Sequence, residues 1–274
     1  MLRGFRATFI SIILILLPYH VGLAENKYIT VASTTSTQNS GLFSAILPLF
    51  EKKTGIKVRV VAVGTGQALR IARQGDADVL FVHHKPSELQ FVEQGFGVKR
   101  FEVMYNDFVI IGPKLDPAGI KGIKEVGLAF KRIAQLKKLF ISRGDDSGTH
   151  KKELSIWARL DFNPKKYSGD WYQEVGAGMG ATLNITAAKR GYTLSDRGTW
   201  ISFKNKQELA ILLSGGPKLL NPYGLILINP KKHPHTKVHE GTKFIYWVIS
   251  QECKNAINNY RVNNLQLFKA APNR

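Results

Sequence analysis

The stretch VKRFEVMYNDFVIIG, residues 98–112, is β-rich and long enough to leave one sheet and enter a second region of the molecule. A turn-rich segment follows it, and β-rich sequence returns at residues 209–213 and again at residues 225–228. We therefore predict that the chain leaves one lobe near residue 112 and comes back to it near residue 222. Two crossings predict two lobes joined by a hinge, and ligand sites are common in such clefts.

On both sides of this stretch, short β-rich runs alternate with longer helical patterns. The strands are predicted at residues 28–32, 56–63, 77–82 and 139–142, and the helices at residues 42–53, 67–73, 87–94, 126–134, 147–160, 178–190, 241–249 and 252–260. Repeated strand–helix–strand units are typical of parallel sheets covered by helices on both faces. The predicted class is a two-lobed α/β fold with a mixed, mostly parallel sheet in each lobe and the ligand cleft at the hinge.

The N-terminus has the pattern of a secretory signal peptide. Two arginines precede an apolar run from Ala7 to Leu17, and small residues lie just before and at Ala24. The apolar run is much shorter than the roughly 20 residues that span a bilayer. We predict that residues 1–24 are cleaved and that the mature chain is periplasmic. The predicted division is then residues 25–112 with 223–274 in lobe I, and 113–222 in lobe II.

The composition is basic, with a formal net charge of +19 and one cysteine. The basic residues are scattered along the chain, and no aromatic-interleaved nucleic-acid motif accompanies them. An exported protein also rarely meets nucleic acid, so we expect no nucleic-acid partner and a solvated basic surface that mildly steers anions. Cys253 cannot form an internal disulfide and is expected to be a small buried residue.

Three loops share one design: each follows a strand and leads into a helix. In the first, ASTTSTQNSGL (residues 32–42), five consecutive residues carry hydroxyls, which exceeds what helix capping needs. In the second, VGTGQAL (residues 63–69), two glycines let the backbone approach a ligand closely, and a threonine adds a donor. The stretch is not a P-loop, because no lysine follows the glycines at the position that this motif requires. Helix N-termini at such places favour anions.

The third loop is in SRGDDSGTHKKE, residues 142–153, where Arg143 is a permanent cation with a donor fork suited to oxyanions. Alternatively, Arg143 pairs with Asp145 or Asp146 at the surface. Ser147, His150 and Asp146 do not suit a catalytic triad, because they crowd one helix start. The adjacent His83 and His84 point to opposite sides of a strand, so a metal site is not expected. Together, the loops predict a cage of neutral donors, with one counter-charge, for a small ionised oxyanion.

With these motifs in view, the mature chain resembles the periplasmic substrate-binding proteins of tungstate ABC transporters, the TupA type. The resemblance rests on STTSTQNSGL, AVGTGQAL, VMYNDFVIIGP, SRGDDSGTHKKE, GAGMGATLN, LSDRGTW and NPYGLILINP. It implies a monomeric, hinge-closing protein of the periplasmic-binding-protein class that is not an enzyme and has no cofactor. The protein would capture tungstate or molybdate and hand it to a membrane permease driven by an ATPase.

The resemblance also implies which residues contact the oxyanion. The implied contacts are Ser33, Thr34, Thr35, Thr65, Gly66, Arg143, Ser147 and Thr149. Ser33 stands where the family commonly has threonine, which keeps the hydroxyl. Asp145 and Asp146 are expected to orient Arg143 and its loop, and Gly176 to Gly180 offer amides without an assigned role.

Two rival functions remain open at this point. Phosphate receptors also place Ser-Gly-Thr at a helix start beside an arginine. Phosphate keeps a proton near neutral pH and needs a carboxylate acceptor, so an Asp145 or Asp146 that points into the cleft would favour phosphate. An exported hydrolase of phosphorylated compounds is the other rival, and it needs a positioned base or metal that the sequence does not supply.

Overall fold

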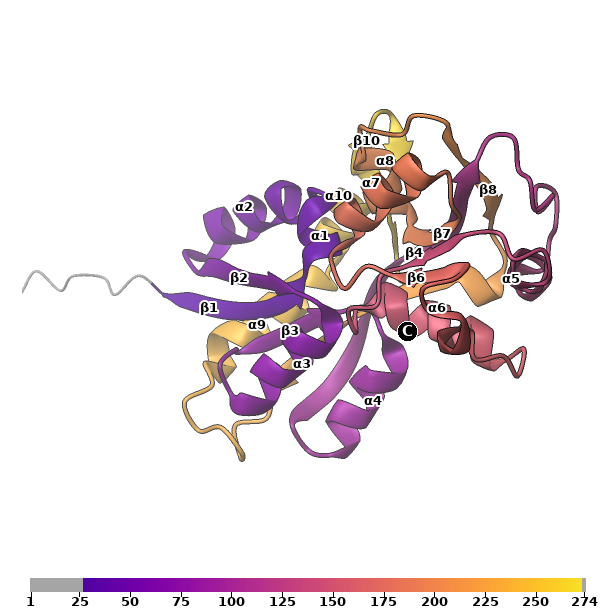
Figure 1. The fold of residues 1–274 in the computed structure, drawn as a ribbon. Helices are drawn as coiled ribbons and strands as arrows, with labels where there is room; N and C mark the ends of the chain where they lie inside the picture. The colour runs from indigo at the N-terminus through magenta and orange to yellow at the C-terminus, as the bar shows by residue number, and fades with distance from the viewer. Residues whose placement is uncertain (1–26, 273–274) are drawn as a thin grey trace, which may run out of the picture.

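The computed structural model describes residues 27–272, which form a mixed α/β molecule with ten α-helices around a curled sheet (Figure 1). The predicted two-lobed α/β class is confirmed. The predicted signal peptide, residues 1–24, lies outside the described residues. No helix within residues 27–272 is long and apolar enough to cross a membrane.

We call lobe I the part of the molecule built on the first three strands. β1 (Tyr28–Thr34) lies between β2 (Lys57–Val63) and β3 (Val79–Val82) and is parallel to both. The helices of this lobe are α2 (Leu42–Thr54), α3 (Thr65–Gln74), α4 (Lys85–Glu93) and α9 (Val238–Val248). Because all three strands are parallel, the loops after β1 and β2 come out at one edge of the sheet.

Two long strands connect the lobes. β4 (Gly97–Pro113) covers the stretch from which the two-lobed prediction began, and β9 (Leu220–Ile228) is the returning strand. The N-terminal part of β4 pairs with β9, whereas its C-terminal part, from Phe108 on, pairs with strands of the second lobe. The predicted boundaries at residues 112 and 223 stay predictions.

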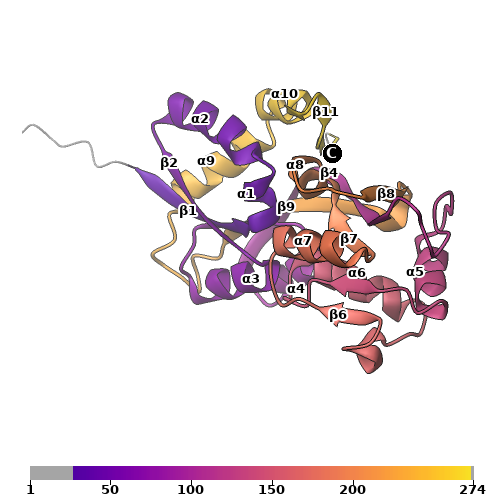
Figure 2. The same ribbon diagram turned by 45° about the horizontal axis from the view of Figure 1, so that its top comes forward.

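Lobe II is the part of the molecule built between these two strands. Its strands are β5 (Phe140–Ser142), β6 (Tyr172–Glu174), β7 (Thr193–Asp196) and β8 (Leu209–Ser214), and its helices are α5 (Val126–Gln135), α6 (Gly148–Ala158), α7 (Met179–Lys189) and α8 (Arg197–Ser202). Figure 2 shows α7 and α8 on the side of lobe II that faces α2 and the short helix α1 (Thr35–Asn39) of lobe I. After α9, the chain ends in α10 (Gln251–Asn259), β10 (Arg261–Val262), β11 (Leu265–Gln266) and β12 (Lys269–Ala270).

The strand directions differ in part from the prediction of mostly parallel sheets. Pairing is parallel among β1, β2 and β3 and between β5 and β6. The long strand β4 is antiparallel to β7, β8, β9 and β12, and β3 is antiparallel to β9. The reason is that β4 leaves lobe I and β9 returns to it. Because β4 runs from lobe I to lobe II and β9 runs from lobe II to lobe I, the two strands have opposite directions and pair antiparallel.

The core is divided by the sheet into three apolar clusters. One cluster lies between the sheet and helices α2 and α9 of lobe I and continues under α7 and α8 of lobe II. The second fills lobe II beneath α5 and α6, and the third lies under α3. Cys253 is fully buried in the first cluster, as predicted. Burial raises the pKa of its thiol to about 12.

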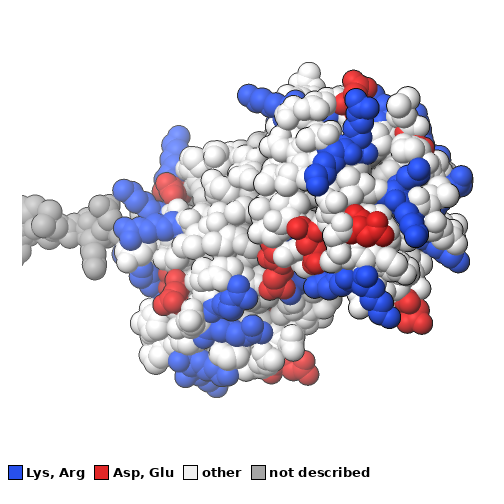
Figure 3. All heavy atoms as spheres, viewed as in Figure 1, with Lys and Arg blue, Asp and Glu red and all other residues white. Residues whose placement is uncertain are grey.

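The basic side chains form no single surface on the face seen in Figure 1. Figure 3 shows lysine and arginine in separate groups around the edges of both lobes, while the middle of this face is mostly uncharged, with some acidic side chains. The scattered distribution predicted from the sequence therefore holds for this face.

Candidate functional site

The hydroxyl-rich stretch spans the end of β1 and a short helix, α1 (Thr35–Asn39). Thr34 is the N-cap of this helix, and its hydroxyl accepts a hydrogen bond from the Thr37 amide at 3.3 Å. The same hydroxyl lies 2.7 Å from that of Thr37 and 3.1 Å from that of Ser36. The sequence reasoning expected a loop up to Leu42, so it missed this helix and the place of Ser36 and Thr37 in it.

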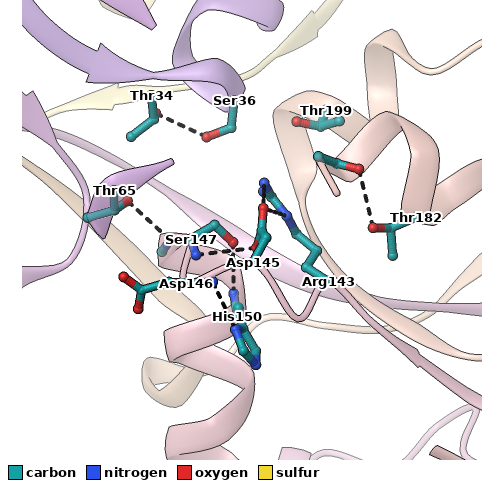
Figure 4. Close-up of polar contacts among 12 residues, drawn as sticks. Thr34, Ser36, Thr65, Arg143, Asp145, Asp146, Ser147, His150, Thr182 and Thr199 are labelled. Carbon is teal, nitrogen blue, oxygen red and sulfur yellow. Dashed lines mark hydrogen bonds and ion pairs between the residues drawn. The ribbon is translucent and has the colours of Figure 1, made fainter. Parts of the chain in front are cut away.

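Ser33 and Thr35 occupy different surroundings. The Ser33 hydroxyl is completely buried and donates to the Phe81 carbonyl of β3 at 2.7 Å. That donation fixes β1 to β3 and commits the only proton of the Ser33 side chain. Thr35 is half-buried at the first position of α1. Thr34 and Ser36 lie toward the space between the lobes, opposite Arg143 (Figure 4).

The loop between β5 and α6 carries Arg143 in a fixed orientation. Arg143 is 3% exposed, and its Nε and Nη2 both donate to one carboxylate oxygen of Asp145. The other Asp145 oxygen accepts from the Ser147 amide at 3.3 Å. Asp145 therefore fixes both the arginine and the start of α6, and Figure 4 shows the guanidinium reaching up between Thr34 and Thr199.

Ser147 and Thr149 lie at the start of α6. Ser147 is the N-cap, and its hydroxyl accepts from the His150 amide at 3.2 Å. Thr149 is 1% exposed, and its hydroxyl has no hydrogen-bond partner within residues 27–272. Because a buried polar group without a partner costs free energy, Thr149 marks a place where a ligand could supply the missing bond.

Ser147, His150 and Asp146 are close in space but are not arranged as a triad. The His150 ring accepts from the Asp146 amide through Nδ1 at 3.1 Å, and its Nε2 has no partner among the described residues. No hydrogen bond joins the imidazole to the Ser147 hydroxyl, whereas a nucleophile and its base need one. Within residues 27–272 there is also no group of three or more histidine, cysteine or acidic side chains that could hold a metal ion.

Thr65 and Gly66, at the start of α3, meet lobe II. The Thr65 hydroxyl is completely buried and accepts a hydrogen bond at 3.1 Å from the backbone amide of Gly148. Gly148 is the first residue of α6. A Cβ at Gly66 would lie 2.8 Å from Cγ of Asp146. This glycine therefore allows a close approach to Asp146 of the other lobe, and its predicted contact with a ligand stays a prediction.

Asp146 contributes a second link between the lobes. One of its oxygens pairs with Lys151 on α6, and the other lies 3.8 Å from Arg70 on α3. The side chains of Asp146 and Arg70 are both more than half exposed, so this pair contributes little free energy. The Thr65–Gly148 bond is the stronger link, because it is buried and therefore shielded from water. These contacts show the lobes closed on each other.

The sequence reasoning weighed His83 only as a metal ligand and missed its position between the lobes. Its Nε2 lies 3.0 Å from the Ser36 hydroxyl, and its Nδ1 lies 3.0 Å from Oδ1 of Asn221 on β9. Burial, aided by the nearby charge of Arg143 and opposed by the hydrogen bond to Asn221, lowers the pKa of His83 to about 4. His83 is therefore neutral at neutral pH.

The segment LSDRGTW places another polar group near Arg143. Asp196 is the N-cap of α8 and accepts from the amide and the hydroxyl of Thr199 at 2.8 and 2.7 Å. Burial raises the pKa of Asp196, and the hydrogen bonds from Thr199 and the charge of Arg143 oppose that rise. In the glycine-rich segment from Gly176 to Gly180, Gly178 is the N-cap of α7. The motif was visible in the sequence, but nothing in it assigned these roles.

The arrangement joins one permanent cation to neutral donors from both lobes. Arg143 supplies the charge, and hydroxyl groups lie around it at the starts of α1, α3 and α6. The carboxylates of Asp145 and Asp146 are already engaged by protein donors. Such a site suits a small anion whose oxygens are all acceptors, since a ligand that carries its own proton would need a free acceptor.

Comparisons with known proteins place the chain in a family. The model of a PBP superfamily domain matches residues 23–252 of the chain. The tungstate-binding protein TupA of Peptoclostridium acidaminophilum is 44% identical over 234 residues, which cover 85% of this chain and 81% of that protein.

Two solved structures are similar over most of the chain. One is a tungstate-binding protein, TupA, from Desulfovibrio alaskensis G20, with 42% identity and a TM-score of 0.79, covering 90% of this chain and all of that one. The other is the tungstate ABC transporter structure from Geobacter sulfurreducens, with 50% identity and a TM-score of 0.77, covering 85% of this chain and 98% of that one.

Proposed function

Because this chain belongs to the TupA family of the PBP superfamily, we propose that it captures tungstate outside the cytoplasm and delivers it to an ABC transporter. The proposal includes the cleavable signal peptide at residues 1–24, a monomeric binding protein, and a permease with its ATPase as the partners. The protein performs no catalysis and needs no cofactor. Molybdate, which has the same tetrahedral shape and charge, is the second ligand.

The observation that carries the proposal is the pairing of Arg143 with uncharged donors from both lobes. Burying a dianion costs much free energy unless its oxygens receive hydrogen bonds. We propose that Thr34, Thr35 and Thr65 of lobe I and Arg143, Ser147 and Thr149 of lobe II donate these bonds, through side chains or amides. Gly66 contributes by letting the lobes meet. Ser33 acts indirectly, because its hydroxyl holds β1 to β3.

Closure follows from the division of donors between the lobes. An oxyanion is fully coordinated only when both lobes contact it, so the ligand binds the closed state more tightly and shifts the population toward it. The buried Thr65–Gly148 bond adds to the closed state without contributing charge.

Phosphate is the second candidate ligand, and the acidic side chains argue against it. A protonated phosphate needs an acceptor, but both Asp145 oxygens and both Asp146 oxygens already face protein donors. A hydrolase of phosphorylated compounds is disfavoured because Ser147 lacks a base. These features support tungstate over the two rivals.

The experiment is calorimetric titration of residues 25–274 with tungstate, molybdate, sulfate and phosphate in turn. We expect tight binding of tungstate, binding of molybdate, and no binding of sulfate or phosphate. Preference for phosphate, or no binding of any oxyanion, would contradict the proposal. A phosphatase assay on the same sample separates the hydrolase alternative.

A further inference from the structure

A chain of buried hydrogen bonds runs from the crossing strands to the hydroxyl cluster of α1. Asn221 on β9 donates through Nδ2 to Oδ1 of Asn106 on β4 at 2.7 Å. Its Oδ1 contacts Nδ1 of His83 at 3.0 Å, and Nε2 of His83 contacts the Ser36 hydroxyl at 3.0 Å. All four side chains are 6% exposed or less.

The direction of these bonds determines where the protons lie. Because Oδ1 of Asn221 can only accept, Nδ1 of His83 must carry a hydrogen and donate it. In a neutral imidazole the other nitrogen then has no hydrogen, so Nε2 accepts. The Ser36 hydroxyl therefore donates to His83. In this arrangement, the proton of Ser36 is directed toward His83.

This direction conflicts with the needs of a fully ionised oxyanion. Such an anion offers only acceptors. A Ser36 hydroxyl whose hydrogen is used in the hydrogen bond to His83 presents only lone pairs to the anion. One more proton on His83 removes the conflict. With both ring nitrogens carrying hydrogens, Nε2 donates to Ser36, and the Ser36 proton is free to turn to the oxyanion.

We propose that His83 takes up one proton from solution when the oxyanion binds, which turns Ser36 into a hydrogen-bond donor to the ligand. The inference rests on the proposed function, since it requires an ionised oxyanion in this site. His83 is a positioning residue, because it acts on the ligand through Ser36.

The charges around His83 set the sign of the effect. Arg143 faces it from the loop before α6, His84 follows it in the chain, and the Tyr223 ring of β9 stacks on it at 4.8 Å. Burial and Arg143 together hold the pKa of His83 at about 4. A dianion beside Arg143 offsets that cation and raises the pKa of His83, so binding takes up a proton and strengthens as pH falls.

The test is calorimetric titration of wild-type protein with micromolar tungstate between pH 5 and pH 8. At each pH, the titration is repeated in buffers of different ionisation enthalpy. The slope of the observed binding enthalpy against the ionisation enthalpy of the buffer gives the number of protons taken up. We expect an uptake that rises toward one proton as pH falls, and an affinity that rises by up to about tenfold per pH unit in the same range. Tight binding with zero uptake and no pH dependence would overturn the inference and leave the proposed function intact.

Two variants identify the group that takes up the proton. In His83→Gln, the side-chain amide can donate to Ser36 permanently, so we expect binding to persist with no proton uptake and little pH dependence. His84→Gln is the matched control, because it removes the neighbouring imidazole, and it should keep the uptake of the wild type. Uptake that survives in His83→Gln would overturn the inference. No binding of tungstate by the wild type would instead contradict the proposed function.

Discussion

Arg143 is the one lysine or arginine among the residues labelled in Figure 4, and its orientation depends on a neighbour two residues away. Asp145 takes two N–H groups on one edge of the guanidinium and holds the Ser147 amide with its second oxygen. One short loop thus orients the cation and the start of α6 together. The sequence reasoning expected this role for Asp145, and the geometry agrees with it.

Replacing Arg143 with alanine should weaken tungstate binding by roughly tenfold or more, because a hydrogen bond to a charged group contributes about 1.5–3 kcal/mol. Arg143→Lys should recover only part of the affinity, since a lysine keeps the charge but not the planar fork. Calorimetry measures both. Arg73→Ala is the control, because Arg73 is a half-buried residue near the end of α3 that donates to Gln94 and takes no part in the proposed site. Equal affinities for wild type and Arg143→Ala would refute the assignment.

Glu153 is a buried carboxyl in lobe II that accepts from the Tyr172 hydroxyl at 2.8 Å and from Nε1 of Trp157 at 3.2 Å. Burial raises its pKa from 4.5 to about 7, although these hydrogen bonds lower it. A folded-state pKa above the unfolded value means that the unfolded chain releases the proton first. The stability should therefore fall as pH rises from about 4.5 through about 7.

Glu153→Gln should remove this loss, because glutamine keeps an acceptor and cannot ionise. The gain in unfolding free energy of the variant over wild type should be larger at pH 8 than at pH 5, by about 2–3 kcal/mol. Urea denaturation at the two pH values measures it. Burial also raises the pKa of Glu88 to about 7, but Glu88 titrates in both proteins and cancels in the difference. An equal gain at both pH values would contradict the account.

Single residues also show how far the sequence could be interpreted. A run of hydroxyl residues signals donors, but it does not tell which hydroxyls are already committed. Ser33 donates to the Phe81 carbonyl, 48 residues away, and His83 meets Asn221 across 138 residues. Such pairings depend on sheet register and chain crossing, which a local pattern does not contain.

At the scale of elements, the closed arrangement depends on α3 and α6 meeting end to end. Thr65 begins α3, Gly148 begins α6, and a hydrogen bond joins them across the lobes. Gly66 leaves room for Asp146 beside this bond. The two helix starts therefore act as one unit that forms only in the closed molecule.

Gly66→Ala should weaken tungstate binding several-fold, because the added Cβ would lie 2.8 Å from Cγ and 3.2 Å from the carbonyl oxygen of Asp146. The side chain of Asp146 must shift before the lobes can close. Gly64→Ala is a control from the same turn, since a Cβ there meets the Asp145 carbonyl at an ordinary 3.7 Å. Competition titrations with tungstate compare the two, and equal affinities would show that the close approach at Gly66 does not matter.

Helices with long apolar patterns were predicted well, and short polar elements were not. The predicted helix at residues 126–134 is α5 (Val126–Gln135), and that at residues 178–190 is α7 (Met179–Lys189). α1 and α8, with five and six residues, were missed. A helix of one to two turns is too short to show an apolar period, and its stability comes from capping by Thr34 or Asp196 and from packing.

At the scale of the whole molecule, two long strands carry the connection between the lobes. The length of the run at residues 98–112 predicted one crossing, and the structure places β4 (Gly97–Pro113) there. The antiparallel pairing of β4 with β9 was not predicted, because strand direction depends on how the chain returns. Asn106 and Asn221 are hydrogen-bonded across this strand pair, so the crossing strands are tied directly to His83 and the site.

The most direct test of the account is a crystal structure of the protein grown with tungstate, in which the anomalous signal of tungsten locates the ligand. The account predicts one strong peak between the starts of α1 and α6, with oxygens within hydrogen-bond distance of Arg143 and of donors from both lobes. A peak elsewhere on the molecule, or one contacted by a single lobe, would contradict the claim that an oxyanion closes the two lobes around itself.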